Sequence, residues 1–208
     1  MPTRPPDTEE LLDRSAAGDR EARGALLQRH RDRLRRMVAA RLDRRLAARL
    51  DPSDVVQEAL HEAERRLDDY LRLRPVPFYP WLRRLAQERL ADEYRRHVAA
   101  GRRSVIREGD PLGLSDASAL RLAERLLDPG TGPSEALRRR EAGQRVRAAL
   151  QALPEADREV LVLRYVEGLS AREAGEVLGV SEAAAKTRAL RALRGLKRLL
   201  GEASEGGR

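Results

Sequence analysis

Positive side chains recur along one stretch near the C-terminal end of the chain, where they could bind phosphate. Residues 181–200 contain six such side chains and one acid, Glu182, which leaves a net charge of +5. The six are Lys186, Arg188, Arg191, Arg194, Lys197 and Arg198. A charge of this density attracts the phosphates of a nucleic acid. The stretch therefore predicts a DNA-binding surface.

The residue types along this stretch also suit the reading of bases. If residues 182–200 form a helix, its inner face consists of Ala185, Ala189, Ala192, Leu193 and Leu196. The outward residues are Ala183, Thr187, Leu190, Arg191 and Arg194, flanked by Lys186 and Arg188. Small residues at the helix start let the backbone approach a major groove, where Lys186, Thr187 and Arg191 reach base edges. An ordinary solvated helix face is the alternative interpretation.

The residues before this helix predict a helix-turn-helix. Ser170 and Glu173 form the S-x-x-E pattern of a capping box, and Gly179 ends the helix that they begin. Ser181 caps the next helix after a three-residue turn. The first helix is too short to be stable alone, so it must bury its apolar residues, Ala174, Val177 and Leu178.

A second candidate for nucleic-acid binding lies in residues 70–94, which contain five of the six aromatic residues of the chain. The five are Tyr70, Phe78, Tyr79, Trp81 and Tyr94, interleaved with Arg83, Arg84, Arg89, Arg95 and Arg96. Aromatic rings among guanidinium groups are typical of proteins that hold unstacked bases. Core packing explains Phe78 and Trp81 at least as well, whereas Tyr79, Tyr94 and the arginines are better placed for DNA.

An acidic patch marks a candidate protein-binding surface. Asp54, Gln57 and Glu58 fall on one side of a helix at spacings of three and four. The opposite side carries the apolar residues Val56, Leu60, Ala63 and Leu67. A patch of this kind on a basic protein suits a basic partner, and a solvated surface is the alternative.

Apolar spacing and helix-breaking residues predict an all-α chain with two small helical domains joined by a flexible linker. The first domain, residues 1–100, has four helices, near 8–16, 19–48, 52–73 and 78–100. Residues 101–133 form the Gly- and Pro-containing linker. The second domain, residues 134–200, has helices near 134–151, 155–167, 170–178 and 182–200. Residues 201–208 form a disordered tail.

Composition excludes several function classes. The 208 residues include no cysteine, which excludes disulfides, zinc fingers and thiol catalysis. They also lack an N-terminal apolar signal and any run of roughly 20 apolar residues, so no membrane insertion and a cytoplasmic location are expected. His30, His61 and His97 are scattered without a metal motif, a phosphate loop or a nucleophile. We expect them at the surface of a protein that is not an enzyme and binds no cofactor or metal.

Four motifs together resemble the extracytoplasmic-function (ECF) group of RNA polymerase sigma factors, in the sigma-70 superfamily. They are Asp54-Val-Val-Gln57-Glu58, Phe78-Tyr-Pro-Trp81-Leu-Arg-Arg-Leu-Ala, Leu153-Pro-Glu-Ala-Asp-Arg158-Glu-Val-Leu-Val-Leu-Arg164-Tyr and Val180-Ser-Glu-Ala-Ala-Ala-Lys-Thr-Arg188-Ala-Leu-Arg191-Ala-Leu. They span both domains in the order of that group. The residues around Thr8–Asp19 and Leu90–His97 look most like a planctomycete-type branch.

The resemblance implies a role for each candidate surface. The first domain would be sigma region 2, which binds the polymerase core (β′ and β subunits) through the β′ clamp helices, with Asp54, Val55, Gln57 and Glu58 as contacts. It would also melt and read the minus 10 element, with a flipped base held by a loop near Gln87-Glu88-Arg89. The implied minus 10 contacts are Tyr79, Arg83, Arg84, Glu88, Arg89, Arg95, Arg96, Arg102 and Arg103. Related sequences often place Asn where this chain has Glu88-Arg89, and a carboxylate beside DNA is unfavourable.

The second domain would be sigma region 4, which reads the minus 35 element of promoter DNA as a duplex. The implied contacts are Ser181, Ala183, Lys186, Thr187, Arg188, Leu190, Arg191 and Arg194. A monomer suffices for such asymmetric binding. Many members of the group are silenced by an anti-sigma factor, although no residue of this chain identifies one.

Three other functions compete with this interpretation. A helix-turn-helix regulator would occupy an operator without engaging polymerase, so changes at Asp54, Gln57 and Glu58 would have no effect. A helical adaptor would bind proteins alone and show no salt-sensitive DNA binding. An enzyme that uses the histidines would need metal-dependent hydrolysis, for which no motif is present.

Overall fold

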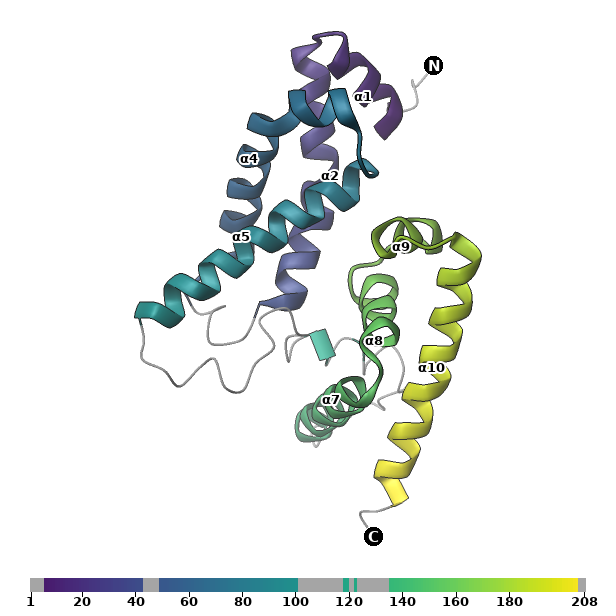
Figure 1. Cartoon of the computed structure of the whole chain (residues 1–208). Helices are drawn as coiled ribbons and strands as arrows, with labels where there is room; N and C mark the ends of the chain where they lie inside the picture. The colour runs from purple at the N-terminus through teal and green to yellow at the C-terminus, as the bar shows by residue number, and fades with distance from the viewer. Residues whose placement is uncertain (1–5, 43–48, 101–117, 120–121, 123–134, 206–208) are drawn as a thin grey trace. The chain divides into compact units, whose positions relative to one another are not determined.

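The structure is a computed structural model that describes residues 6–42, 49–100, 118–119, 122 and 135–205. Every regular element among these residues is helical (Figure 1), which confirms the all-α prediction. The chain divides into two compact units, which are Met1–Val38 with Leu50–Ile106, and Ala39–Arg49 with Arg107–Arg208. No helix in the described part is long and apolar enough to cross a membrane.

The first unit is built from α1 (Thr8–Ala16), most of α2 (Arg20–Arg41), α4 (Pro52–Leu73) and α5 (Phe78–Ala100). These bounds match the four predicted helices, except that α2 ends at Arg41, before the predicted end at 48: Leu42 is not helical, and residues 43–48 lie outside the described part. Aspartates cap three of the helices. Asp7, Asp19 and Asp51 accept hydrogen bonds from the backbone N–H groups of Glu10, Ala22 and Ser53.

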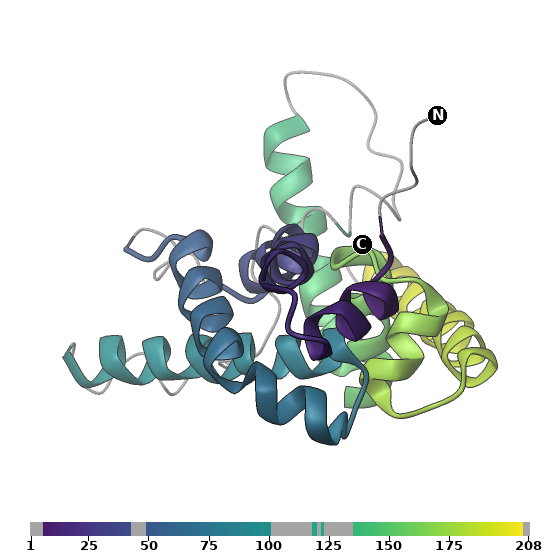
Figure 2. The ribbon, with the colours of Figure 1, turned by 90° about the horizontal axis from the view of Figure 1, so that it is seen from above.

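The core of the first unit forms where α4 packs on α1 and α5, and Figures 1 and 2 both show α5 crossing beside α4. Val56, Leu60, Ala63 and Leu67 of α4 are buried, as their spacing predicts. Three aromatic rings close the α4–α5 end of this core. The ring centroid of Tyr70 lies 4.6 Å from Trp81 and 5.3 Å from Phe78. Burial raises the pKa of Tyr70 to about 12, and its hydroxyl donates to Val76 O at 2.9 Å.

The second unit consists of α7 (Glu135–Ala152), α8 (Glu155–Leu161), the π-helical turn η1 (Val162–Val166), α9 (Ala171–Leu178) and α10 (Glu182–Glu205). The predicted helix 155–167 is therefore divided between α8 and η1. The prediction of a disordered tail from residue 201 is wrong for residues 201–205, because α10 continues to Glu205. An ion pair between Arg198 and Glu202, 3.8 Å apart, joins successive turns there. Residues 206–208 lie outside the described part.

The core of the second unit forms where α10 packs on α7, α8 and α9. Its buried residues include Val146, Leu150, Val160 and Leu196. Leu122 belongs to the same cluster and is fully buried. Most of the predicted linker, residues 101–133, lies outside the described part, but Leu122, one of its described residues, belongs to this core.

Candidate nucleic-acid interface

The local sequence sets the geometry of the helix-turn-helix, α9 and α10. Both hydrogen bonds of the predicted capping box are present, from Glu173 N to Ser170 Oγ at 3.2 Å and from Ser170 N to Glu173 Oε2 at 2.7 Å. Gly179 ends α9 with φ +66°, in the left-handed region that glycine adopts without strain. The Ser181 hydroxyl accepts from Ala184 N at 3.2 Å, as expected of the α10 cap. The predicted motif is therefore confirmed.

Gly175 allows close approach within this motif. A Cβ atom placed on Gly175 would lie 2.7 Å from Val180 O and 3.3 Å from both C and O of Ser181. These are backbone atoms of the turn, so they cannot move aside as a flexible side chain would. Val180 N also donates to Gly175 O at 2.9 Å. The absence of a side chain at Gly175 therefore permits the close contact between α9 and the turn.

The two faces of α10 separate as the helical wheel predicts. Ala185, Ala189, Ala192 and Leu196 are buried and Leu193 is half-buried. The predicted outward residues Ala183, Thr187, Leu190, Arg191 and Arg194 are all exposed, as are Ser181 and Lys186, and Arg188 is half-buried. Leu190 is 57% exposed, unusual for a large apolar side chain. The α10 surface therefore combines positive, hydroxyl and apolar groups, which are the types that contact phosphates, base edges and thymine methyl groups.

Two of the positive side chains on this surface have acidic partners. Lys186 Nζ lies 2.6 Å from Glu182 Oε1, and this hydrogen bond lowers the pKa of Glu182. Arg191 donates to Asp157 of α8 from two nitrogens, at 3.2 and 2.5 Å, and this pair raises the pKa of Arg191. Asp157 lies in one of the motifs that carry the resemblance, but it was not predicted as a contact. Its pairing crosses from one helix to another 34 residues away, which no local spacing encodes.

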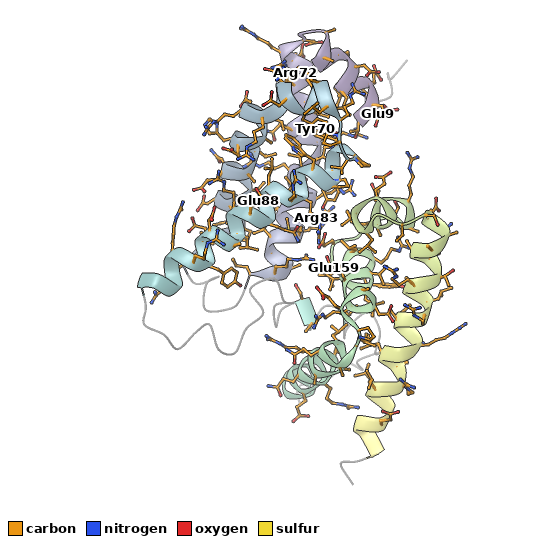
Figure 3. All side chains as sticks on the ribbon, viewed as in Figure 1. Glu9, Tyr70, Arg72, Arg83, Glu88 and Glu159 are labelled. Carbon is orange, nitrogen blue, oxygen red and sulfur yellow. The ribbon has the colours of Figure 1, made fainter. Side chains whose placement is uncertain are left out.

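The candidate minus 10 surface is only partly available on α5. Arg84, Glu88, Arg95 and Arg96 are exposed, and Glu88 and Arg83 are labelled in Figure 3. The side chain of Arg83 is buried, which gives no support to its predicted contact with DNA. Arg83 lies one helical turn after Tyr79, so both fall on the inward face of α5.

Tyr79 is also buried, which gives no support to its predicted role as a DNA contact. Its ring stacks on His30 of α2, with ring centroids 5.8 Å apart. The guanidinium carbon of Arg33 lies 3.9 Å from the ring centroid, within the range of a cation–π interaction. Tyr94 is half-buried. The arginine that accompanies Tyr79 thus comes from α2 and serves packing rather than base stacking.

The segment Gln87–Arg89 is helical, not the loop that the resemblance implies, since α5 runs unbroken from Phe78 to Ala100. Within it, Arg89 is half-buried and its Nη2 lies 3.4 Å from Glu62 Oε2 on α4. Arg102 and Arg103 lie outside the described residues.

Glu62 is an acid on the buried side of α4 that the sequence analysis missed. Its side chain is 10% exposed, and Arg66, Arg65 and Arg89 surround it at 2.5, 3.3 and 3.4 Å. Burial raises the pKa of Glu62, but the hydrogen bond from Arg66 and the three positive charges outweigh it and lower the pKa overall. The sequence did contain a signal for this residue, because the apolar pattern predicts burial at a position where the residue is an acid.

Because the pKa of Glu62 is lowered in the folded state, its carboxylate adds stability above its unfolded pKa of about 4.3, and this stability is lost as the pH falls toward the folded pKa. We expect Glu62→Gln to flatten the decline of the unfolding midpoint in urea between pH 6 and 3 (roughly the range in which carboxylates titrate). Glu64→Gln, which removes an exposed acid from the same helix, should keep the wild-type slope. Equal slopes in all three proteins would contradict this assignment.

The candidate protein-binding patch on α4 is accessible. Asp54, Gln57 and Glu58 are exposed and lie on the side opposite the buried apolar stripe. Val55, which the resemblance adds to this patch, is 1% exposed. Val55 belongs to the core, so the structure gives no support to the predicted contact of its side chain with a partner.

The histidines occupy different environments in the part of the chain that the structure describes. His30 is buried against Phe78, with ring centroids 5.4 Å apart, so its predicted surface location is wrong. His61 is exposed as predicted, and the side chain of His97 lies outside the described part. Among the residues whose positions are described, no group of three or more His, Asp or Glu side chains could hold a metal ion.

The sequence relatives agree with the family that the motifs resemble. Residues 143–196, from α7 to the middle of α10, match the family model for sigma-70, region 4. The chain is 34% identical to the RNA polymerase sigma factor CnrH of Cupriavidus metallidurans over 97% of this chain and 98% of that one. It is 32% identical to the ECF RNA polymerase sigma factor SigD of Mycobacterium tuberculosis, over 88% and 79% of the two chains.

A longer relative and a solved structure are also similar to this chain. The chain spans 41% of a longer relative, the probable RNA polymerase sigma factor RfaY of Xanthomonas campestris, at 30% identity over 87% of its own length. The solved structure of CnrH in complex with the cytosolic domain of CnrY matches 94% of this chain and 99% of that one. The TM-score of this match is 0.52 at 26% identity.

Proposed function

Because this chain belongs to the ECF group of RNA polymerase sigma factors, we propose that its two units bind core polymerase and read the two elements of a promoter. The exposed outer surface of α10, within the segment that matches sigma-70 region 4, carries this proposal. Positive groups and groups that can hydrogen-bond to bases, presented together on one face of a helix, are typical of a DNA-binding helix. The first unit adds the polymerase-binding surface, and no chemical step on DNA or nucleotide is required of either.

The second unit would read the minus 35 element as duplex DNA. Ser181 and Ala183 begin the helix with little bulk, so the backbone can lie close to a groove. Lys186, Thr187 and Arg191 then reach base edges, while Arg188 and Arg194 bind phosphates. Leu190 offers an apolar contact to a thymine methyl group.

The first unit would melt and read the minus 10 element with the exposed residues of α5. Arg84, Arg95 and Arg96 would bind phosphates by exchanging their ion pairs with the α5 acids Glu88, Asp92 and Glu93 for contacts with DNA. Arg89 joins this surface if its contact with Glu62 exchanges for a contact with DNA. Arg102 and Arg103 belong to the same proposed surface on the strength of the sequence resemblance.

Core polymerase would bind the exposed α4 patch of Asp54, Gln57 and Glu58, through the clamp helices of its β′ subunit. Exposed carboxylates on a protein of net charge +8 select for a basic protein surface and against DNA. The β subunit would complete the complex, in which the chain acts as a monomer in the cytoplasm. Since the matched CnrH structure contains the cytosolic domain of CnrY, we propose an anti-sigma partner for this chain also.

Run-off transcription tests the proposal. Bacterial core polymerase, with and without the full chain, would transcribe a fragmented genomic library, and the start sites would be mapped. We expect new start sites with shared upstream elements only when the chain is present. DNA binding by the chain without any new start site would refute the proposal in favour of an operator-binding regulator.

A further inference from the structure

Among the described side chains of the α10 surface, Arg191 is the one paired with an acid of another helix. Its Nε donates to Asp157 Oδ2 at 3.2 Å, and its Nη2 donates to Asp157 Oδ1 at 2.5 Å. We infer that Asp157 is a positioning residue, which holds Arg191 so that it recognises a guanine in the minus 35 element. This inference rests on the proposed function and adds a specificity to it.

The N–H donors of Arg191 that do not bond to Asp157 match the acceptors of guanine. A guanidinium group has five N–H donors in one plane, and Asp157 accepts from the edge formed by Nε and Nη2. The adjacent edge, formed by Nη1 and the second hydrogen of Nη2, presents two parallel donors. Guanine offers two acceptors, O6 and N7, in the major groove, and arginine pairs with both in the commonest specific contact.

Exposure differs across the pair, so the guanidinium of Arg191 is accessible from solvent while its partner carboxylate is not. The side chain of Asp157 is 9% exposed, whereas that of Arg191 is 68% exposed. Asp157 lies in the first turn of α8, on a different helix from Arg191. The guanidinium plane is thus set before DNA arrives, which lowers the entropy lost on binding.

The net charge around an arginine distinguishes a base contact from a phosphate contact. The Asp157–Arg191 pair has no net charge, so it attracts phosphate weakly but keeps its directional hydrogen bonds. Arg194 lies three residues further along α10 and is exposed, and within the described residues it makes no hydrogen bond or ion pair. Arg194 therefore has the properties of a phosphate contact and serves as the matched comparison.

The test measures base preference rather than activity alone. Holoenzyme made from core polymerase and the full chain would select promoters from a library randomised in the minus 35 element, followed by sequencing. The wild type should prefer guanine at one position by roughly tenfold or more. Arg191→Lys and Asp157→Asn should both reduce that preference to less than about threefold, because lysine cannot form the paired hydrogen bonds and asparagine lacks one acceptor.

Two controls separate positioning from folding and charge. Asp157→Asn added to Arg191→Ala should not reduce the guanine preference below that of Arg191→Ala alone, because both residues act through one contact. Arg194→Ala should weaken binding to all library members alike and leave the guanine preference intact. Arg191→Lys provides the test even if Asp157→Asn fails to fold.

Each outcome bears on a different claim. Unchanged guanine preference in Arg191→Lys or in folded Asp157→Asn would overturn the inference alone, since specific initiation would still occur. Uniform loss of affinity in Arg191→Lys, without a change of preference, would make Arg191 a phosphate contact and overturn it too. A holoenzyme that selects no promoter at all would refute the proposed function, and the inference with it.

Discussion

Replacing Asp54, Gln57 and Glu58 together by alanine should lower promoter-specific transcription by more than about tenfold, which corresponds to about 1.4 kcal/mol of lost binding energy. All three side chains are exposed on α4, so their removal leaves no cavity and the unit should stay folded. The loss would come from the contact with core polymerase. Native gel shifts of core polymerase and run-off transcription on one selected promoter would measure binding and activity in parallel.

The matched control also removes two negative charges, but from other positions in the first unit. Asp32 on α2 and Glu64 on α4 are both exposed acids outside the patch. Their double alanine variant should bind polymerase and initiate like the wild type. Equal losses in the control and the triple variant would attribute the effect to net charge, and no loss in either would exclude the α4 patch as the polymerase contact.

The sequence predicted the helix-turn-helix well because its determinants are local. Ser170 and Glu173 lie within one turn of each other, and Gly179 adopts the left-handed conformation that its residue type favours. The separation of faces on α10 is also local, because alanines and leucines at spacings of three and four alternate with Thr187, Arg191 and Arg194. Such features need no knowledge of what packs against the helix.

The failures concern residues whose environment depends on another helix. Tyr79 and Arg83 share types with real nucleic-acid contacts, yet the packing of α5 on its neighbours buries both. Apolar and arginine residues occur on several sides of α5, so its sequence does not define one inner face. His30 was misplaced for the same reason, since it is buried against Phe78, a residue distant in sequence.

The pairs that matter most for the two surfaces were also beyond local reasoning. Glu62 meets Arg89, and Asp157 meets Arg191, only because α4 packs on α5 and α8 packs on α10. Both acids occupy positions that the helical pattern assigns to the interior or to a cap. An acid in such a position needs a positive partner. The sequence therefore signals that a partner exists, although it does not identify that partner.

Gly175→Ala should destabilise the second unit by about 1–3 kcal/mol, the usual effect of overpacking. The new Cβ would meet Val180 O at 2.7 Å, so the turn must move away from α9. Since Val180 and Ser181 set the direction in which α10 begins, transcription from promoters that need a minus 35 element should fall by roughly tenfold. Thermal unfolding and run-off transcription would measure the two effects.

Gly201→Ala is the matched control, because the same substitution in α10 meets no heavy atom within 4 Å. Alanine is the better helix former, so this variant should be more stable by about 0.5–1 kcal/mol and transcribe like the wild type. The opposite signs of the two changes distinguish close packing at Gly175 from helix propensity, which is the same for both. Stabilisation of the chain by Gly175→Ala would contradict this prediction. It would mean that the tight contact between α9 and the turn does not set the position of α10, so that recognition of the minus 35 element would depend on the α10 side chains alone.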